Sequence, residues 1–167
     1  MLTGFALRRG IDVVQNPDLV ALDVTDQGGL RYGTDITVTY SGREIRLLSI
    51  HLKAFCFDNP LATSSNACRT LNEQLPVLES WIDAQATAAI PLVVLGDFNR
   101  RINELGDEFW IKVDDAEPPN ADLTKSTLGL VSQGWDSQYP SYIDHIVNRS
   151  PHLPMGPGRI FSASFVY

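Results

Sequence analysis

The sequence lacks the features that mark membrane and secreted proteins. No apolar run approaches the roughly 18 residues needed to cross a membrane, although apolar residues make up 44% of the chain. The first residues, from Met1 to Arg9, have no apolar stretch of the kind that a signal peptide carries. We therefore expect a globular protein with no membrane span and, by default, a cytoplasmic location.

Positive charge is also scarce. The chain has 13 Lys and Arg residues against 20 Asp and Glu residues, which gives a formal net charge of −7. Loose binding to nucleic acid depends on clustered Lys and Arg side chains that release counterions. We expect no strong nucleic-acid patch. A nuclease is not excluded, because a bound divalent cation offsets negative charge locally.

Several catalytic signatures are missing as well. The sequence contains no Gly-x-Ser-x-Gly elbow, no Gly-rich phosphate loop and no dinucleotide-binding fingerprint. It has two cysteines, Cys56 and Cys68, which are too far apart for a metal knuckle. A disulfide that closes the turn-rich stretch between them and two free thiols are both consistent with the sequence.

The sequence fits a single domain over residues 1–167, because its length allows one sizeable core and no repeat or linker divides it. Apolar residues at 19–24 predict a strand. Alternation predicts a hairpin in which residues 36–40 and 45–50 pair around the turn Ser41-Gly42. Further strands are expected at 142–147 and 160–166.

Between these strands, one helix is expected. Leu71, Leu75, Leu78 and Ile82 recur at helical spacing, and the pattern runs to about residue 88 with Pro76 inside it. This stripe predicts a face packed against the core.

The stretch from Pro91 to Arg101 carries the clearest chemistry. Four apolar residues, 92–95, predict a buried strand that Gly96 ends. If strand geometry persists, alternation places Asp97 and Asn99 on one face. A carboxylate can accept a proton or bind a hard cation, and an amide can donate to an anionic oxygen. A simple turn explains these residues equally well.

Other polar residues stand near the ends of predicted strands. His51 follows the second hairpin strand, and Asp144 and His145 lie inside an apolar strand, where an unpaired acid is costly. Arg100 and Arg101 are candidates for phosphate contact, although such pairs more often form a solvated face.

Three segments occur in order: Ser49-Ile-His-Leu-Lys, Gly96-Asp-Phe-Asn and Tyr142-Ile-Asp-His-Ile-Val. Together they resemble the endonuclease/exonuclease/phosphatase superfamily, the DNase I-like metal-dependent phosphoesterases. The resemblance implies an α/β fold of two packed β-sheets flanked by helices. It also implies Mg²⁺-dependent attack of water on a phosphodiester or phosphomonoester.

Carried over by position, the resemblance gives each residue a role. His51 would hold the scissile phosphate, Asp97 would orient and activate water, and Asn99 would bond a phosphate oxygen. Asp144 would match the family acid that pairs with a second histidine. Asp97 and Asn99 would also be the metal ligands, for Mg²⁺ or alternatively Mn²⁺ or Ca²⁺, while His145 would be a weaker phosphate contact.

The family's metal-binding Glu, on a strand ending in Gln-Glu, and its closing Ser-Asp-His motif are missing from these 167 residues. The resemblance therefore implies a single partial domain. Missing strands would leave open sheet edges, which favour a homo-oligomer.

Three interpretations follow: an active phosphoesterase, a catalytically inactive remnant that serves as a binding or structural module, or a piece of a longer reading frame. The substrate type is not specified by these residues. The acidic balance favours a small substrate over a long polyanion.

Overall fold

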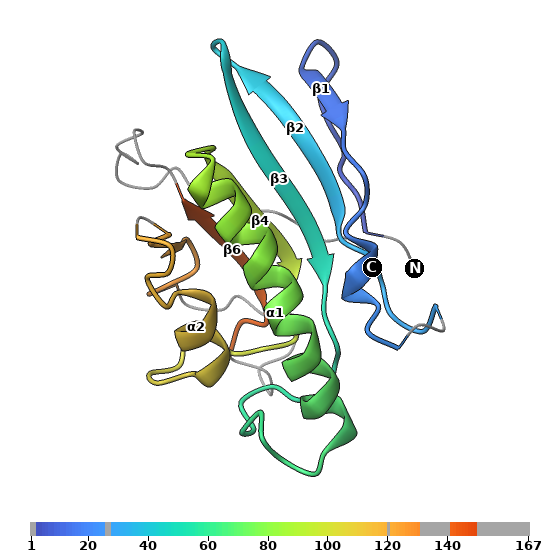
Figure 1. Cartoon of the computed structure of the whole chain (residues 1–167), viewed down its shortest axis with the longest axis vertical. Helices are drawn as coiled ribbons and strands as arrows, with labels where there is room; N and C mark the ends of the chain where they lie inside the picture. The colour runs from blue at the N-terminus through green and yellow to red at the C-terminus, as the bar shows by residue number, and fades with distance from the viewer. Residues whose placement is uncertain (1–2, 26–27, 120, 131–140, 150–167) are drawn as a thin grey trace.

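A computed structural model describes residues 3–25, 28–119, 121–130 and 141–149 of the chain. This part forms a six-stranded mixed sheet in the order β1-β2-β3-β4-β6-β5. Figure 1 labels β1 to β4 and β6 of this sheet. The strands are β1 (Asp12–Gln15), β2 (Thr34–Tyr40), β3 (Arg43–His51), β4 (Leu92–Asp97), β5 (Thr124–Lys125) and β6 (Asp144–Arg149).

The described helices are η1 (Val20–Leu22), a 3-10 turn, and the α-helices α1 (Asn66–Thr87) and α2 (Glu108–Val113). The strand expected at 19–24 is therefore wrong. Only Leu19 makes a bridge, to Gly33, and the chain then coils so that Leu22 enters the core with 1% exposure. A short apolar run fits a buried turn as well as a strand.

The predicted hairpin is confirmed. Tyr40 of β2 pairs with Arg43 of β3, and both turn residues have positive φ, 51° at Ser41 and 74° at Gly42. From β3 the chain crosses through α1 to β4, which lies parallel to β3, while β6 lies antiparallel on the other side of β4. The central strands β3, β4 and β6 thus come from distant parts of the sequence.

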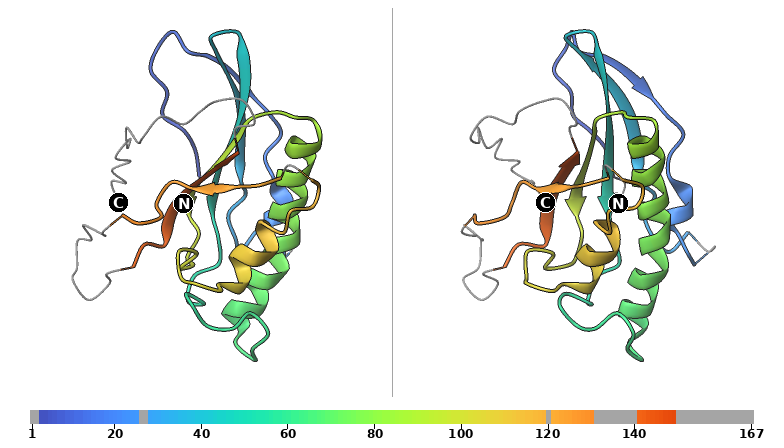
Figure 2. Two further views of the ribbon diagram at one scale, coloured as in Figure 1. Left: turned by 90° about the vertical axis from the view of Figure 1, so that its left-hand side faces the viewer. Right: turned by 60° about the vertical axis from the view of Figure 1, so that its left-hand side comes forward.

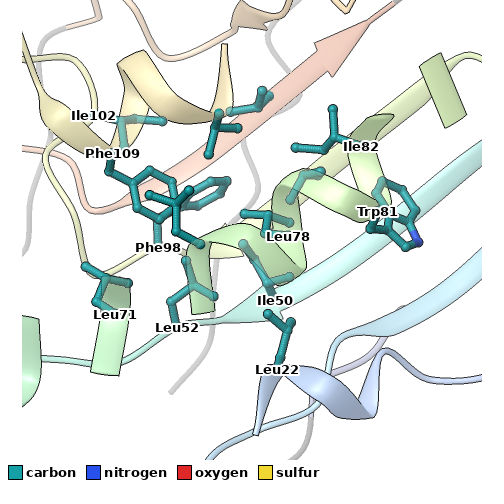
Figure 3. Close-up of a cluster of buried hydrophobic side chains, with 14 of the residues drawn as sticks. Leu22, Ile50, Leu52, Leu71, Leu78, Trp81, Ile82, Phe98, Ile102 and Phe109 are labelled. Atoms are coloured by element: carbon teal, nitrogen blue, oxygen red, sulfur yellow. The ribbon is translucent and has the colours of Figure 1, made fainter. Parts of the chain in front are cut away.

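The core lies between the sheet and α1 (Figure 3). Figure 2 shows the long helix lying along one face of the sheet. The predicted stripe of α1 is buried there, and it meets alternate residues of the sheet, among them Leu48, Ile50, Val94 and Val147. Because neighbouring strand residues point to opposite faces, His51, Asp97 and Asp144 lie on the face away from α1.

The architecture is a mixed α/β fold that is incomplete relative to a two-sheet sandwich, since the described residues contain one sheet. The strand expected at 160–166 lies outside the described residues. Among the described helices, none is long and apolar enough to span a membrane.

Candidate functional site

Three polar side chains meet where β3, β4 and β6 adjoin. His51, the last residue of β3, is in register with Asp97, the last residue of β4. Asp97 is also paired with Asp144, the first residue of β6. Nε2 of His51 lies 3.7 Å from Oδ2 of Asp97. Opposed residues of an antiparallel pair typically have Cβ atoms about 4.5–5.5 Å apart, so the two carboxylates are also neighbours.

Gly96 allows this close approach. Its φ is +131°, and a Cβ atom added there would lie 2.1 Å from the backbone oxygen of Ile50. No side chain fits at that distance, so glycine is required for β4 to remain against β3 up to Asp97. Past the strand, the amide of Leu52 donates to the carbonyl of Asp97 at 2.9 Å.

Asn99 has a different position from the one expected. β4 ends at Asp97, and Asn99 has a φ of +50°, so strand alternation does not extend to it. Its backbone amide donates to Oδ1 of Asp97 at 2.8 Å, and its side-chain amide donates to the carbonyl of Leu52 at 3.0 Å. Asn99 is buried. It thus joins the ends of β3 and β4 and fixes the rotamer of Asp97.

Both carboxylates are costly to ionise where the fold holds them. Burial raises the pKa of Asp144 to about 6, and the neighbouring charge of Asp97 adds to the rise. Burial also raises the pKa of Asp97, against the opposing effects of the Asn99 amide and of His51. Like charges held together in a partly buried place are typical of functional sites, because folding alone does not favour them.

The pKa of His51 is shifted in the other direction. Burial lowers its pKa, and the nearby charge of Asp97 only partly offsets this effect. Both His51 and Asp97 also have a lowering contribution from the positive charge of Arg31. His51 is therefore a neutral hydrogen-bonding group near pH 7 rather than a fixed cation.

Sequence reasoning missed Arg31. It lies in the loop before β2, and its Nε is a buried atom with no hydrogen-bond partner. No motif or spacing marks this residue, because it is brought to the site only by the β2–β3 hairpin. Its guanidinium supplies positive charge that acts on Asp97 and His51.

Arg100 is placed away from the candidate site. Its side chain is 2% exposed, its Nε donates to Oδ2 of Asp107 at 2.7 Å, and its Nη1 donates to the carbonyl of Asn59 at 2.6 Å. A guanidinium with these buried partners has no access to a phosphate, so this assignment is corrected.

His145 is also placed on the core side of the sheet. Nδ1 is 2.8 Å from the hydroxyl of Thr127, and Nε2 is 2.9 Å from the carbonyl of Arg100. The ring packs edge-on against Phe98. Burial lowers the pKa of His145 to about 4, which keeps the ring neutral. This neighbour of Asp144 therefore supports the loop after β4 and does not face the carboxylates.

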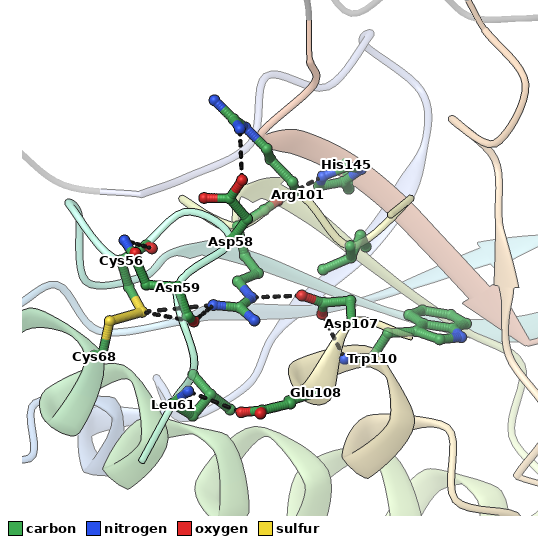
Figure 4. Close-up of polar contacts among 12 residues, drawn as sticks. Cys56, Asp58, Asn59, Leu61, Cys68, Arg101, Asp107, Glu108, Trp110 and His145 are labelled. Carbon is green, nitrogen blue, oxygen red and sulfur yellow. Dashed lines mark hydrogen bonds and ion pairs between the residues drawn. A yellow bond between two sulfur atoms is a disulfide. The ribbon is translucent and has the colours of Figure 1, made fainter. Parts of the chain in front are cut away.

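Arg101 remains near the surface, where its Nη1 lies 2.8 Å from Oδ2 of Asp58 (Figure 4). The same figure shows Cys56 joined to Cys68, so the structure forms the disulfide that the sequence left open. This bond ties the loop that follows β3 to the first turn of α1.

The fit of a divalent cation can be judged from the donors. Mg²⁺ is commonly held by one or two carboxylates, with water and substrate phosphate completing the shell. The adjacent carboxylates of Asp97 and Asp144, with their raised pKa values, suit that role. In the described part of the chain, however, no group of three or more His, Cys, Asp or Glu side chains could hold a metal ion without such help.

Comparison of the sequence with protein-family models finds no match, and comparison with curated proteins finds none either. Solved structures do show similarity. A 3′ phosphatase from Neisseria, NExo, bound to a product DNA hairpin, has 17% identity and a TM-score of 0.49, and the match covers 84% of this chain and 58% of that one. The human Nocturnin catalytic domain has 20% identity and a TM-score of 0.44, and the match covers 70% of this chain and 40% of that domain's chain.

An endonuclease/exonuclease/phosphatase family protein from Leptotrichia buccalis has 16% identity and a TM-score of 0.43, with 72% of this chain and 43% of that chain covered. The chain thus spans about half the length of such structures. In its three ordered motifs and in the mixed α/β fold that carries them, the chain resembles the endonuclease/exonuclease/phosphatase superfamily, the DNase I-like phosphoesterases, over part of such a domain.

Proposed function

We propose that this chain is a metal-dependent phosphoesterase whose reaction is attack of water on a phosphodiester or phosphomonoester. The observation that supports it best is the meeting of His51, Asp97 and Asp144 at adjoining strand ends. Two partly buried carboxylates beside a neutral imidazole and a guanidinium offer a proton acceptor, a cation site and phosphate donors in one place.

In this proposal each side chain has a separate task. Asp97, held by the Asn99 amide, orients the attacking water and accepts its proton. The imidazole N–H of His51 and the guanidinium of Arg31 donate to non-bridging phosphate oxygens. Asp144 and Asp97 would hold a divalent cation, proposed to be Mg²⁺, which would offset charge on the phosphate when bound.

The raised pKa of Asp97 supports its role as the base. A carboxylate with an ordinary pKa is a weak proton acceptor at neutral pH, and burial strengthens it. The second amide hydrogen of Asn99 is the proposed donor to a phosphate oxygen, because the first is bonded to the carbonyl of Leu52.

Hydrolysis of bis(p-nitrophenyl) phosphate with and without Mg²⁺ tests the proposal. Asp97→Asn should lower kcat by about 10²–10⁴-fold, the usual contribution of a general base. Asp58→Asn is the matched control, since this carboxylate lies nearby but pairs with Arg101. Equal rates in the wild type and in Asp97→Asn, or no Mg²⁺-dependent hydrolysis at all, would reject the proposal.

A second candidate function is a catalytically inactive binding or structural module that forms a homo-oligomer. It is favoured by β1, which lies at one edge of the described sheet with all four residues exposed, Val14 at 63%. An exposed edge strand without Pro or Lys is a template for pairing with a second copy. Light scattering should then show a dimer that Val14→Lys converts to monomer; a monomeric wild type excludes this candidate.

A further inference from the structure

Phe55 is an exposed aromatic side chain in an otherwise well-anchored loop. It is 72% exposed, whereas the next residue, Cys56, is 0% exposed and bonded to Cys68 of α1. A single exposed phenylalanine is ordinary on a protein surface. The position and the rigidity of Phe55 distinguish it from such a residue.

The position is set by the two strand ends that carry the site. Phe55 follows His51 by four residues, in the loop that leaves β3. Phe57 forms a parallel bridge with Arg100, and the amide of Arg101 donates to the carbonyl of Phe57 at 3.4 Å. The loop therefore lies along the segment that follows Asp97, at the same end of the sheet as the carboxylates.

The rigidity comes from three constraints. Phe55 and Phe57 both have positive φ, 75° and 52°, a conformation that bulky residues adopt only when their surroundings impose it. The disulfide fixes the residue between them to α1 (Figure 4). The rings of Phe55 and Phe57 pack edge to face with centroids 6.4 Å apart. The Phe55 ring is thus held outward by the fold.

We propose that Phe55 is a stacking platform for an unpaired nucleobase next to the scissile phosphate, so that the substrate is a short single-stranded nucleotide ester. This inference rests on the proposed phosphoesterase function and specifies its substrate class. A rigid, solvent-facing ring gives up little side-chain entropy when a base stacks on it. The net charge of −7 disfavours a long polyanion, while the positive charge of Arg31 acts on Asp97 at the site itself.

A binding measurement tests the platform without turnover. In the Asp97→Asn background, fluorescence anisotropy compares a labelled thymidine hexamer with an abasic hexamer of the same backbone. Phe55→Ala should weaken binding of the thymidine hexamer by about 5- to 150-fold, the range that loss of base–aromatic stacking gives. Binding of the abasic hexamer should stay unchanged, and Phe55→Trp should bind the thymidine hexamer as tightly as the parent.

Tyr40→Ala is the matched control, because this aromatic is 74% exposed but lies at the β2–β3 turn, at the other end of β3 from His51. Its affinity for both hexamers should equal that of the parent. The proposal is overturned if Phe55→Ala binds the thymidine hexamer normally, if both hexamers lose affinity equally, or if Tyr40→Ala has the same effect. Circular dichroism melts of each variant exclude unfolding as the cause.

The two proposals can fail separately. If bis(p-nitrophenyl) phosphate is hydrolysed and Phe55→Ala binds the thymidine hexamer normally, the stacking role of Phe55 is rejected and the phosphoesterase proposal stands. If no hydrolysis occurs but Phe55→Ala weakens binding of the thymidine hexamer alone, the phosphoesterase proposal is rejected and the stacking role of Phe55 stands.

Discussion

Two clusters of buried or partly buried charged side chains lie close together in the sequence. One combines opposite charges, and the other combines like charges. In one, Arg100 faces Asp107, each side chain 2% exposed, and hydrogen bonds satisfy the guanidinium. In the other, Asp97 and Asp144 are neighbours of like charge, and burial raises the pKa of both. Opposite charges hold the loop after β4 in place, whereas like charges are kept together at a cost that ligand binding can repay.

The largest effect is expected from breaking the opposite-charge cluster. Arg100→Met should lower the free energy of unfolding by about 3–5 kcal/mol, because it leaves the carboxylate of Asp107 buried and uncompensated. Urea denaturation measures the change. Arg101→Met is the control, since its ion pair with Asp58 is partly exposed and should contribute about 0–1 kcal/mol. Similar losses in both variants would mean that burial of Arg100 is not what matters.

The disulfide supports the same cluster from the other side. Nη1 of Arg100 lies 3.5 Å from Sγ of Cys56. Replacing Cys56 and Cys68 with Ser should lower the free energy of unfolding by about 2–4 kcal/mol, because the unfolded chain regains the freedom of the loop between them. Thermal denaturation of this double variant, beside the wild type with and without a dithiol reductant, checks the value. If the reductant leaves the wild-type melting curve unchanged while the double variant is destabilised, loss of packing rather than of the cross-link is responsible.

The like-charge cluster should respond in the opposite direction. Asp144→Asn should raise the free energy of unfolding by about 1 kcal/mol at pH 7 in metal-free buffer, while lowering phosphoesterase activity. The folded-state pKa, at about 6, lies above that of the unfolded chain, so the ionised carboxylate destabilises the fold at pH 7. The gain should shrink as the pH falls below 6 and disappear once Asp144 is protonated in both states.

A lower stability of Asp144→Asn at pH 7 would show that Asp144 is a structural acid with a partner. Asp107→Asn is the comparison variant, because its carboxylate faces Arg100 and its replacement should destabilise the fold. Denaturation curves of the two variants at the same pH decide whether the two clusters differ as described.

The sequence predicts the like-charge cluster better than its opposite-charge neighbour. His51 and Asp97 each stand at the end of a readable apolar run, and Asp144 lies inside another, so the sequence marks all three as polar residues of predicted strands. Arg100 and Arg101 are adjacent and chemically identical, so only the packing of the loop after β4 decides which one is buried. That packing depends on Asp107 and Asn59, which no periodic pattern connects to Arg100.

The other differences between the sequence prediction and the structure have similar physical causes. The sequence predicts a strand where η1 forms, because a short apolar run satisfies either structure. Alternation predicts a strand-face position for Asn99, because a positive φ at a non-glycine residue leaves no mark in the sequence. Arg31 reaches the site only through tertiary pairing of β2 with β3.

The smallest expected effect comes from like charges at the surface of α1. Burial first, and then the nearby charges of Asp115 and Asp83, raise the pKa of Glu79. Protonated Glu79 is therefore favoured in the fold, and this contribution is lost as the pH rises through the folded-state pKa. Glu79→Gln should raise the free energy of unfolding by a few tenths to about 1 kcal/mol at pH 7, since solvent screens exposed charges. Glu73→Gln, which removes a contact with Arg69, should give no gain in the same urea series. If both variants gain equally at pH 7, reduction of the overall negative charge, rather than the cluster around Glu79, accounts for the stability.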